Sequence, residues 1–158
     1  MGHFGFSYIG LLYLLMLYIP NGLWAKNKPI GYSPVGENKV LLILERTGQV
    51  LSTVSILLFK DYEPKSFEIW ILWFIASFIL MLLYVVNWIR YFRSERTVKD
   101  FYSSILGIPV PGATLPVLAF LLLGIYGKVI WLGISSIVLG IGHIGIHINH
   151  SIDIDNEY

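Results

Sequence analysis

Two ionisable residues, Glu45 and Arg46, lie next to each other inside an apolar stretch that runs from Val40 to Phe59. A charged side chain at the centre of a membrane helix costs about 2.5–3.5 kcal/mol on insertion scales, so such residues usually serve a function. A carboxylate in this setting can bind a cation, exchange a proton or act as a general base. A guanidinium can hold a phosphate or a carboxylate. The residue types at this position therefore allow cation binding, proton transfer or anion binding.

Three histidines near the end of the chain share one face of a predicted helix. His143, His147 and His150 are spaced i, i+4 and i+7, which places them on one side of an α-helix. Imidazole titrates near neutral pH and is a common metal ligand. Two roles follow. In the first, the histidines and Glu45 relay protons; in the second, His143 and His147 bind a divalent metal ion, with His150 or Glu45 as third ligand and water as fourth.

Further polar side chains extend the candidate site. Gln49 falls within about 40° of Glu45 at ~100° per residue, whereas Arg46 points about 100° away. Asn87 and Arg90 come near the end of another apolar stretch, at a similar membrane depth. We therefore predict a ligand-binding site formed by residues from separate helices: Glu45, Arg46, Gln49, Asn87, Arg90, His143 and His147.

The composition indicates the elements that must position these residues. The chain has 158 residues, of which 56% are hydrophobic and 13% charged, whereas soluble domains contain roughly 25% charged residues. A membrane span needs about 20 mostly apolar residues. Five stretches qualify, at about 4–24, 39–59, 67–92, 105–127 and 129–149. The sequence predicts an all-α, polytopic integral membrane protein, with residues 1–158 forming a single transmembrane domain of five helices.

The first apolar stretch and the connection after the third span each allow more than one interpretation. No Lys or Arg precedes the first apolar stretch and no A-x-A site follows it, so we expect a retained span and not a signal peptide. Residues 93–104 repeat apolar side chains at helical spacing opposite charged and hydroxyl residues. They fit either a helix lying in the cytoplasmic interface or a cytosolic extension of the third span.

Basic residues predict the orientation, because cationic loops remain on the cytoplasmic side during insertion. The connections after the first and third spans hold most of them: Lys26, Lys28, Lys39, Arg90, Arg93, Arg96 and Lys99. The opposite side receives Lys60, Lys65 and Lys128. We expect a multi-pass protein of the cell membrane, with the N-terminus outside and the C-terminus in the cytoplasm. The predicted site then lies in the cytoplasmic half.

The fourth and fifth spans carry two further signals. Pro109, Pro111 and Pro116 fall at the start of the fourth span, and proline removes an amide donor and clashes with the preceding turn. Two readings follow: a broken helix that lines a ligand site, or a connecting loop followed by a mild kink. Small residues in the fifth span, Ser136 and Gly140 among them, allow close helix packing. A homo-oligomer would use the same composition.

Short sequence motifs exclude a few kinds of chemistry but do not identify a function. The chain has no cysteine, which excludes disulfides, thiolate catalysis and Fe–S clusters. It also lacks GxSxG and P-loop motifs, and its short basic loops give no support for nucleic-acid binding. Our first hypothesis is a protein of the lipid bilayer that binds or transports a small molecule, ion or lipid. The alternatives are a membrane-embedded enzyme acting on a lipid or prenyl substrate, and an accessory or immunity protein whose polar network is structural.

Overall fold

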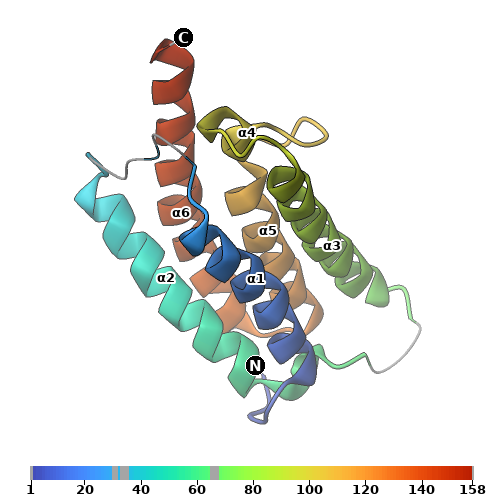
Figure 1. Ribbon diagram of the computed structural model, residues 1–158. Coiled ribbons are helices and arrows are strands. Elements are labelled where there is room, and N and C mark those ends of the chain that lie inside the picture. The colour runs from blue at the N-terminus through green and yellow to red at the C-terminus, as the bar shows by residue number, and fades with distance from the viewer. Residues whose placement is uncertain (1, 30–31, 33–35, 65–67, 158) are drawn as a thin grey trace.

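Five long helices run alternately up and down through the molecule (Figure 1). The computed structural model describes residues 2–29, 32, 36–64 and 68–157. The long helices are α1 (Tyr8–Lys26), α2 (Lys39–Leu58), α3 (Ile71–Arg93), α5 (Pro111–Tyr126) and α6 (Ile130–Glu157). The connections hold a 3₁₀ turn, η1 (Lys60–Tyr62), and a short helix, α4 (Val98–Tyr102). Within the described ranges there is no β-strand, only two isolated bridges, so the fold is all-helical as predicted.

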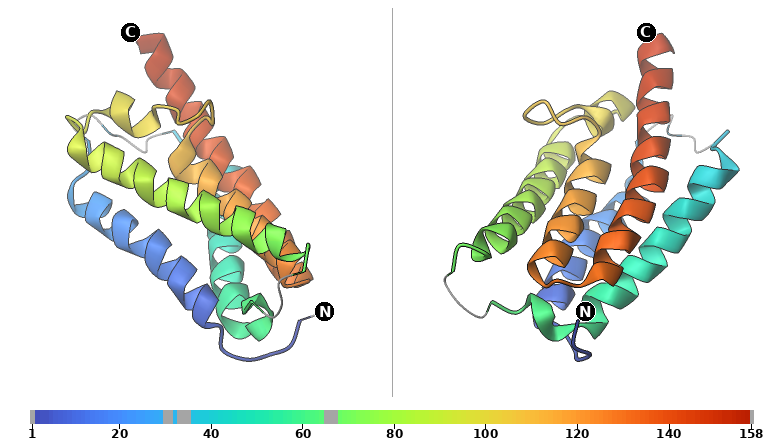
Figure 2. Two further views of the ribbon diagram at one scale, coloured as in Figure 1. Left: turned by 90° about the vertical axis from the view of Figure 1, so that its right-hand side faces the viewer. Right: turned by 180° about the vertical axis from the view of Figure 1, so that it is seen from behind.

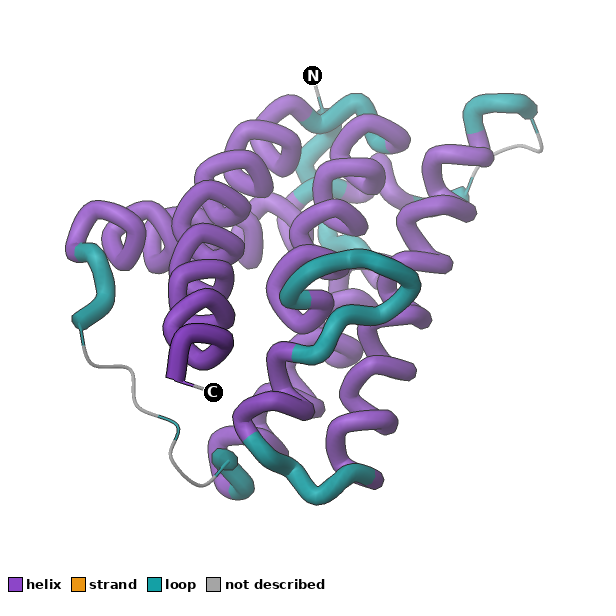
Figure 3. The backbone as a smooth tube through the Cα atoms, turned by 90° about the horizontal axis from the view of Figure 1, so that it is seen from above, coloured by secondary structure: helices purple, strands orange, loops and turns teal. Residues whose placement is uncertain are grey.

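The helices form a ring whose neighbours differ from the chain order (Figures 2 and 3). α2 packs along α6, α6 along α5, and α5 along α3, in extensive contacts. α1 contacts α2 and α3 over a smaller area and closes the ring between them. The chain ends lie at opposite ends of the bundle, with the C-terminus beside α4. The α2–α6 contact, between segments about 100 residues apart, therefore joins the two least apolar of the long helices.

The outer surface is suited to a membrane. α1, α2, α3 and residues Ile130–Ile154 of α6 are long and apolar enough to span a bilayer, and α5 is a shorter apolar helix. Large apolar side chains on their outer faces are exposed, for example Leu15, Ile43 and Leu72. Exposure of this kind all around a bundle is unfavourable in water. The molecule is therefore a helical membrane bundle.

The predicted span at 105–127 is wrong in its first part. Helix α5 begins only at Pro111, which fits the first helical turn because its missing N–H would be unpaired there anyway. Residues before it form a tight loop, in which Leu106, Gly107 and Val110 have positive φ. α5 stays continuous through Pro116. Its 16 residues extend about 24 Å, less than the ~30 Å hydrocarbon thickness.

Other boundaries differ by a few residues. The segment predicted at 93–104 contains a helix only at Val98–Tyr102, because Ser94 caps the end of α3. The extension of the third helix through these residues is therefore wrong. Thr97 and Asp100 form a capping box that starts α4. The predicted start of the third span, at residue 67, and Lys65 lie outside the described residues.

Helix starts are fixed by side chains from near and far in the sequence. Ser7 accepts a hydrogen bond from the amide of Gly10, and Glu63 accepts from the amides of Tyr8 and Ile9. A carboxylate at a helix N-terminus also offsets the helix dipole. Asn38 caps α2 by accepting from the amide of Val40 at 2.8 Å. These caps fix the residues at which α1 and α2 begin, and the two starts lie at opposite ends of the bundle.

A buried hydroxyl network joins three helices at the core. The Ser77 hydroxyl of α3 donates to the carbonyl of Ala119 in α5, at 2.7 Å, and contacts the Tyr13 hydroxyl of α1 at 3.0 Å. Ser77 and Tyr13 are fully buried, and aromatic rings such as Phe120 surround them. Because buried hydroxyls are costly when unpaired, this network stabilises the α1–α3–α5 side of the bundle. This network does not reach the α2–α6 side of the bundle, which is held by different contacts.

Candidate functional site

Glycines allow α2 and α6 to approach until their backbones touch. A Cβ atom at Gly142 would collide with the backbone of Glu45 and Leu41, and one at Gly48 with the backbone of Leu139. Small residues have this role in membrane bundles, where close packing replaces the hydrophobic effect as the driving force. The two contacts set the antiparallel register of α2 and α6. This register brings residue 45 next to residue 143.

Glu45 and His143 form the centre of the candidate site. The distance between Oε1 of Glu45 and Nδ1 of His143 is 2.5 Å. Gln49, one turn further along α2, donates to the same carboxylate oxygen at 3.5 Å. The side chains of Glu45 and His143 are only 16% and 23% exposed. Their pairing compensates for placing two ionisable groups in an apolar bundle. Of the three histidines that were predicted to approach Glu45, His143 is the one bonded to it.

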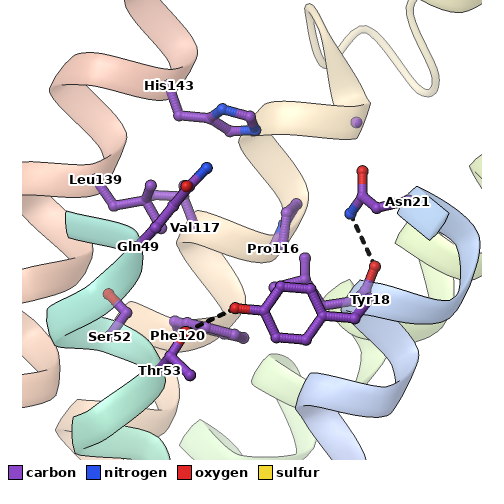
Figure 4. A pocket seen from close by; sticks show the side chains of 12 residues that line it. Tyr18, Asn21, Gln49, Ser52, Thr53, Pro116, Val117, Phe120, Leu139 and His143 are labelled. Carbon is purple, nitrogen blue, oxygen red and sulfur yellow. Dashed lines mark hydrogen bonds between the residues drawn. The ribbon is translucent and has the colours of Figure 1, made fainter. Parts of the chain in front are cut away.

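A cavity adjoins this pair (Figure 4). It has a volume of about 280 Å³ and lies between four of the helices. Its wall is formed by Leu17, Tyr18 and Asn21 of α1, Gln49, Ser52 and Thr53 of α2, Gly112, Pro116, Val117 and Phe120 of α5, and Leu139 and His143 of α6. For scale, a cavity of ~150 Å³ accommodates benzene.

The wall has an apolar part and several separate polar groups. Phe120, Val117 and Leu139 supply apolar surface, while His143 and Gln49 stand at one end of the cavity (Figure 4). Ligand sites in proteins commonly combine a mainly apolar lining with a few placed polar groups. The cavity therefore fits a molecule with an apolar body and at least one hydrogen-bonding group.

Ser52 is the most informative group in the wall. Its side chain is buried, with the residue 1% exposed, and its hydroxyl has no hydrogen-bond partner among the described residues. A buried hydroxyl without a partner costs about 1–3 kcal/mol. Ser77, equally buried, is fully paired. The unpaired Ser52 hydroxyl is thus available to a molecule in the cavity.

Pro116 adds a backbone group to the same wall. Because proline has no amide hydrogen, the carbonyl of Gly112 lacks its usual helical donor four residues later. Both residues line the cavity. A Cβ at Gly112 would meet only the Asn87 amide, at 3.9 Å, so the glycine leaves open space here. The helix is unbroken, and of the three prolines only Pro116 lines the cavity.

α1 closes the side of the cavity through polar contacts. The Tyr18 hydroxyl is 2.7 Å from the Thr53 hydroxyl of α2, and the Tyr18 side chain lies half exposed on the outer surface. On the other side of α1, Asn21 donates to the Tyr84 hydroxyl of α3 at 2.8 Å. The α1–α2 boundary is therefore held by few contacts, one of which is a hydrogen bond at the cavity.

The other two histidines lie further along α6, beyond the cavity. The rings of His143 and His147 are 4.6 Å apart between centroids. His150 is held by the Tyr102 hydroxyl, 3.1 Å from Nδ1, and by Glu37, whose Oε1 is 3.8 Å from Nε2. Burial raises the pKa of Tyr102, so its phenol stays protonated as a hydrogen-bonding group.

The predicted metal centre is not formed in this arrangement. Within the described part of the chain, no group of three or more histidine, aspartate or glutamate side chains is placed to hold a metal ion. The physical reason is that His143 and His150 point to different partners, Glu45 and Tyr102. The three imidazoles form a line and do not converge on one point.

Of the predicted site residues, only Gln49 and His143 line the cavity, and three others lie away from both the cavity wall and the Glu45–His143 pair. Arg46 is exposed on the outer face of α2. Arg90 donates to the carbonyls of Ser103 and Ser104 and to Oδ1 of Asn87, at 2.8–2.9 Å. Asn87 is buried behind Gly112. Arg90 and Asn87 thus anchor the segment after α4 to α3, whereas Glu45, Gln49, His143 and His147 group around the α2–α6 contact.

Several residues were not identified as part of the site from the sequence. Tyr18, Thr53 and Phe120 line the cavity, and Glu37 and Tyr102 bind His150. Glu37 lies just before Asn38, the N-cap of α2, and eight positions from Glu45, which corresponds to about 80° of helical rotation. Helical spacing therefore gave no signal for Glu37. Tyr18, Thr53 and Phe120 carry no sequence signal that separates them from other core or lipid-facing residues.

Comparisons with known proteins give no relative. No protein-family model, no curated protein and no solved structure matches the chain.

Proposed function

We propose that this protein binds a small amphipathic molecule in the cavity between α1, α2, α5 and α6. The unpaired, buried hydroxyl of Ser52 is the observation that carries this proposal. A protein that needed only a packed core would gain stability by replacing this hydroxyl with an apolar group. A bound molecule that hydrogen-bonds Ser52 removes the cost.

The wall chemistry indicates the class of ligand. Phe120, Val117 and Leu139 would contact an apolar body about the size of one or two rings, and Ser52, Gln49 and His143 would contact its polar group. The Glu45 carboxylate holds Nδ1 of His143, which leaves Nε2 for the ligand. A molecule with a hydroxyl or carbonyl group satisfies this set, either as a free metabolite or as the end of a lipid.

The orientation is part of the proposal. The connections that hold Lys26, Lys28, Arg93, Arg96 and Lys99 lie at the same end as the C-terminus, and cationic connections favour the cytoplasmic side. We place this end in the cytoplasm of a cell and the His3 end outside. The ligand then binds in the cytoplasmic half, within reach of both the bilayer and the aqueous phase.

A second candidate is an enzyme that acts on a lipid. The carboxylate–imidazole pair at the cavity favours it, because such a pair can act as a general base. Against it, neither Arg46 nor Arg90 lines the cavity as an anion clamp. Binding therefore remains the first proposal. Turnover of a bound lipid, abolished by His143→Gln while binding persists, would favour the enzyme.

Binding is tested with 4-(trifluoromethyl)phenol as a probe, followed by ¹⁹F NMR on the full-length protein in nanodiscs. We expect a protein-bound resonance that Gly112→Leu removes, because leucine would fill the open space beside the cavity. The matched control is Gly133→Leu, at another helical glycine with no atom within 4 Å of a Cβ but outside the cavity.

Two results would reject the cavity as a binding site. One is the absence of a bound resonance in the wild-type protein together with the absence of any co-purifying small molecule by native mass spectrometry. The other is equal loss of binding in Gly112→Leu and Gly133→Leu, which would assign the effect to general damage to the bundle.

A further inference from the structure

A line of acidic and imidazole groups runs along α6 from the cavity toward the C-terminal end of the bundle. Its members, in spatial order, are Glu45, His143, His147, His150 and Glu37. We refer to these five residues as the histidine file. Of the five, only His143 lines the cavity, with Glu45 bonded to it, so the remaining three need a separate explanation.

A carboxylate lies beside an imidazole at each end of the file. At the cavity, Glu45 pairs with His143; at the other end, Glu37 pairs with His150. The pairing follows from the antiparallel register, since moving from 45 back to 37 on the α2 side corresponds to moving from 143 to 150 on α6. The glycine contacts that set the register therefore produce both pairs.

His147 connects the two pairs. Its ring centroid is 4.6 Å from that of His143 and 6.4 Å from that of His150. The aromatic rings of Phe101 and Tyr102 in α4 cover it, at 5.9 and 5.8 Å. Among the described residues nothing hydrogen-bonds its imidazole. A phenylalanine would fill this aromatic setting without burying polar nitrogens, so packing alone does not explain a histidine here.

We propose that the histidine file conducts protons between the cavity and the surface near Glu37. An imidazole accepts a proton on one nitrogen and releases the proton of the other, so it passes on one proton and returns to neutrality. Rotation of a ring, or a single bridging water, can carry a proton across ring separations of 4.6 and 6.4 Å. The proposal rests on the side-chain geometry and does not require that the cavity hold a ligand.

The path can be followed atom by atom. A proton from water reaches Nε2 of His150 beside Glu37, Nδ1 releases its proton to the Tyr102 hydroxyl, and this hydroxyl passes its own proton on toward His147. His147 passes a proton to His143, which releases its Nδ1 proton to the Glu45 carboxylate. The result is one proton moved from water to Glu45, with all three imidazoles neutral again. The reverse sequence returns it.

Few other titratable groups face the file. Tyr102 of α4 is bonded to His150, and Tyr32, from the connection before α2, has its ring 6.3 Å from that of His150. α5 has no titratable side chain between Pro111 and Ile125. No alternative acid or base on α5 therefore bypasses His147.

The test measures how fast the His143 ring N–H exchanges with water, by ¹⁵N–¹H NMR of ¹⁵N-histidine-labelled, full-length protein in nanodiscs. His147→Phe keeps an aromatic ring against Phe101 and Tyr102 but has no nitrogen. We expect exchange at His143 to slow by about 100-fold, the lower range for loss of a positioned acid–base group. His3→Phe, at a histidine that is bonded to Asp61 of η1 and not to the file, is the matched control and should leave the rate unchanged.

A second variant separates conduction from packing. In His147→Ala, exchange at His143 should be slow and should recover when free imidazole is added, because imidazole can occupy the vacated volume. Unchanged exchange in His147→Phe would overturn the proposal. So would slow exchange in His147→Ala that imidazole does not restore, since this would assign the effect to distorted packing. Failure of the phenol probe to bind would reject the ligand cavity but not proton conduction. Proton conduction is judged only by the exchange rate at His143.

Discussion

At the scale of single residues, two polar side chains of α2 have opposite situations. Glu45 is paired with His143, whereas the hydroxyl of Ser52, two turns away, is unpaired among the described residues. A paired group contributes to the stability of the empty protein, and an unpaired one lowers it until a ligand binds. Stability and binding measurements on these residues should therefore separate structural from functional roles.

The Glu45–His143 pair should give a measurable coupling energy. In a double-mutant cycle of Glu45→Gln and His143→Gln, measured by SDS-induced unfolding, we expect a coupling of about 1 kcal/mol. The control cycle combines Arg46→Gln with His143→Gln and should be additive, because Arg46 is exposed on the outer face of α2. Additivity in both cycles would contradict a direct Glu45–His143 interaction.

Ser52 and Ser77 should respond in opposite ways to replacement by alanine. Ser52→Ala should not lower the free energy of unfolding, since no hydrogen bond is lost, but should weaken probe binding about fivefold, the worth of one neutral hydrogen bond. Ser77→Ala should cost about 1–3 kcal/mol because it leaves the Tyr13 hydroxyl and the Ala119 carbonyl without their partner. A stability loss in Ser52→Ala as large as that in Ser77→Ala would show that Ser52 is structural.

At the scale of secondary-structure elements, the contact between α2 and α6 decides the site. Gly48 and Gly142 let the two backbones touch and set the register in which Glu45 meets His143. α4 then covers His147 with Phe101 and Tyr102. The site is thus built between elements, and displacement of α2 by one small side chain should disturb it.

Two glycines of α6 should give effects of opposite sign. Gly142→Ala places a Cβ against the backbone of Glu45, and we expect a loss of about 1–3 kcal/mol in unfolding free energy from overpacking. Gly133→Ala has no atom within 4 Å of the new Cβ and should gain about 0.5–1 kcal/mol, because alanine favours a helix interior over glycine. SDS-induced unfolding measures both changes. Equal effects at the two positions would argue against close packing at Gly142.

At the scale of the whole molecule, the ring of helices encloses a cavity that chain neighbours alone would not form. α2 lies against α6 and α1 closes the ring between α2 and α3, so four helices contribute to the wall. The short α5 ends before the full membrane thickness, and the loop before it, with buried Val110, lies at the C-terminal end of the bundle.

The orientation can be measured directly because the chain has no cysteine. Glu95→Cys and Glu68→Cys place single thiols at exposed positions in connections at opposite ends of the bundle. With a membrane-impermeant maleimide on intact cells, we expect labelling at residue 68 and protection at residue 95, since the cationic connections favour the cytoplasm. Labelling after permeabilisation is the control for thiol reactivity. The reverse pattern would place the C-terminus outside.

Several features were determined by the sequence alone, because helical periodicity is a local property. The apolar stretches, the polar face of α2 with Glu45 and Gln49, and the shared face of the histidines are read directly from residue spacing. The prolines at 109 and 111 signalled a late helix start as one of two readings, and that reading is the observed one. The span at 105–127 was overextended because apolar composition does not distinguish an apolar loop from a helix.

Only the tertiary structure decided which groups meet. Glu45 could have paired with any of the histidines or with Arg90; it pairs with His143, while Arg90 binds the carbonyls of Ser103 and Ser104. The choice depends on the register between α2 and α6, which the backbone contacts at Gly48 and Gly142 set. Such contacts join residues about 90–100 positions apart and leave no periodic trace in one sequence. The cavity and the unpaired Ser52 hydroxyl follow from the same packing.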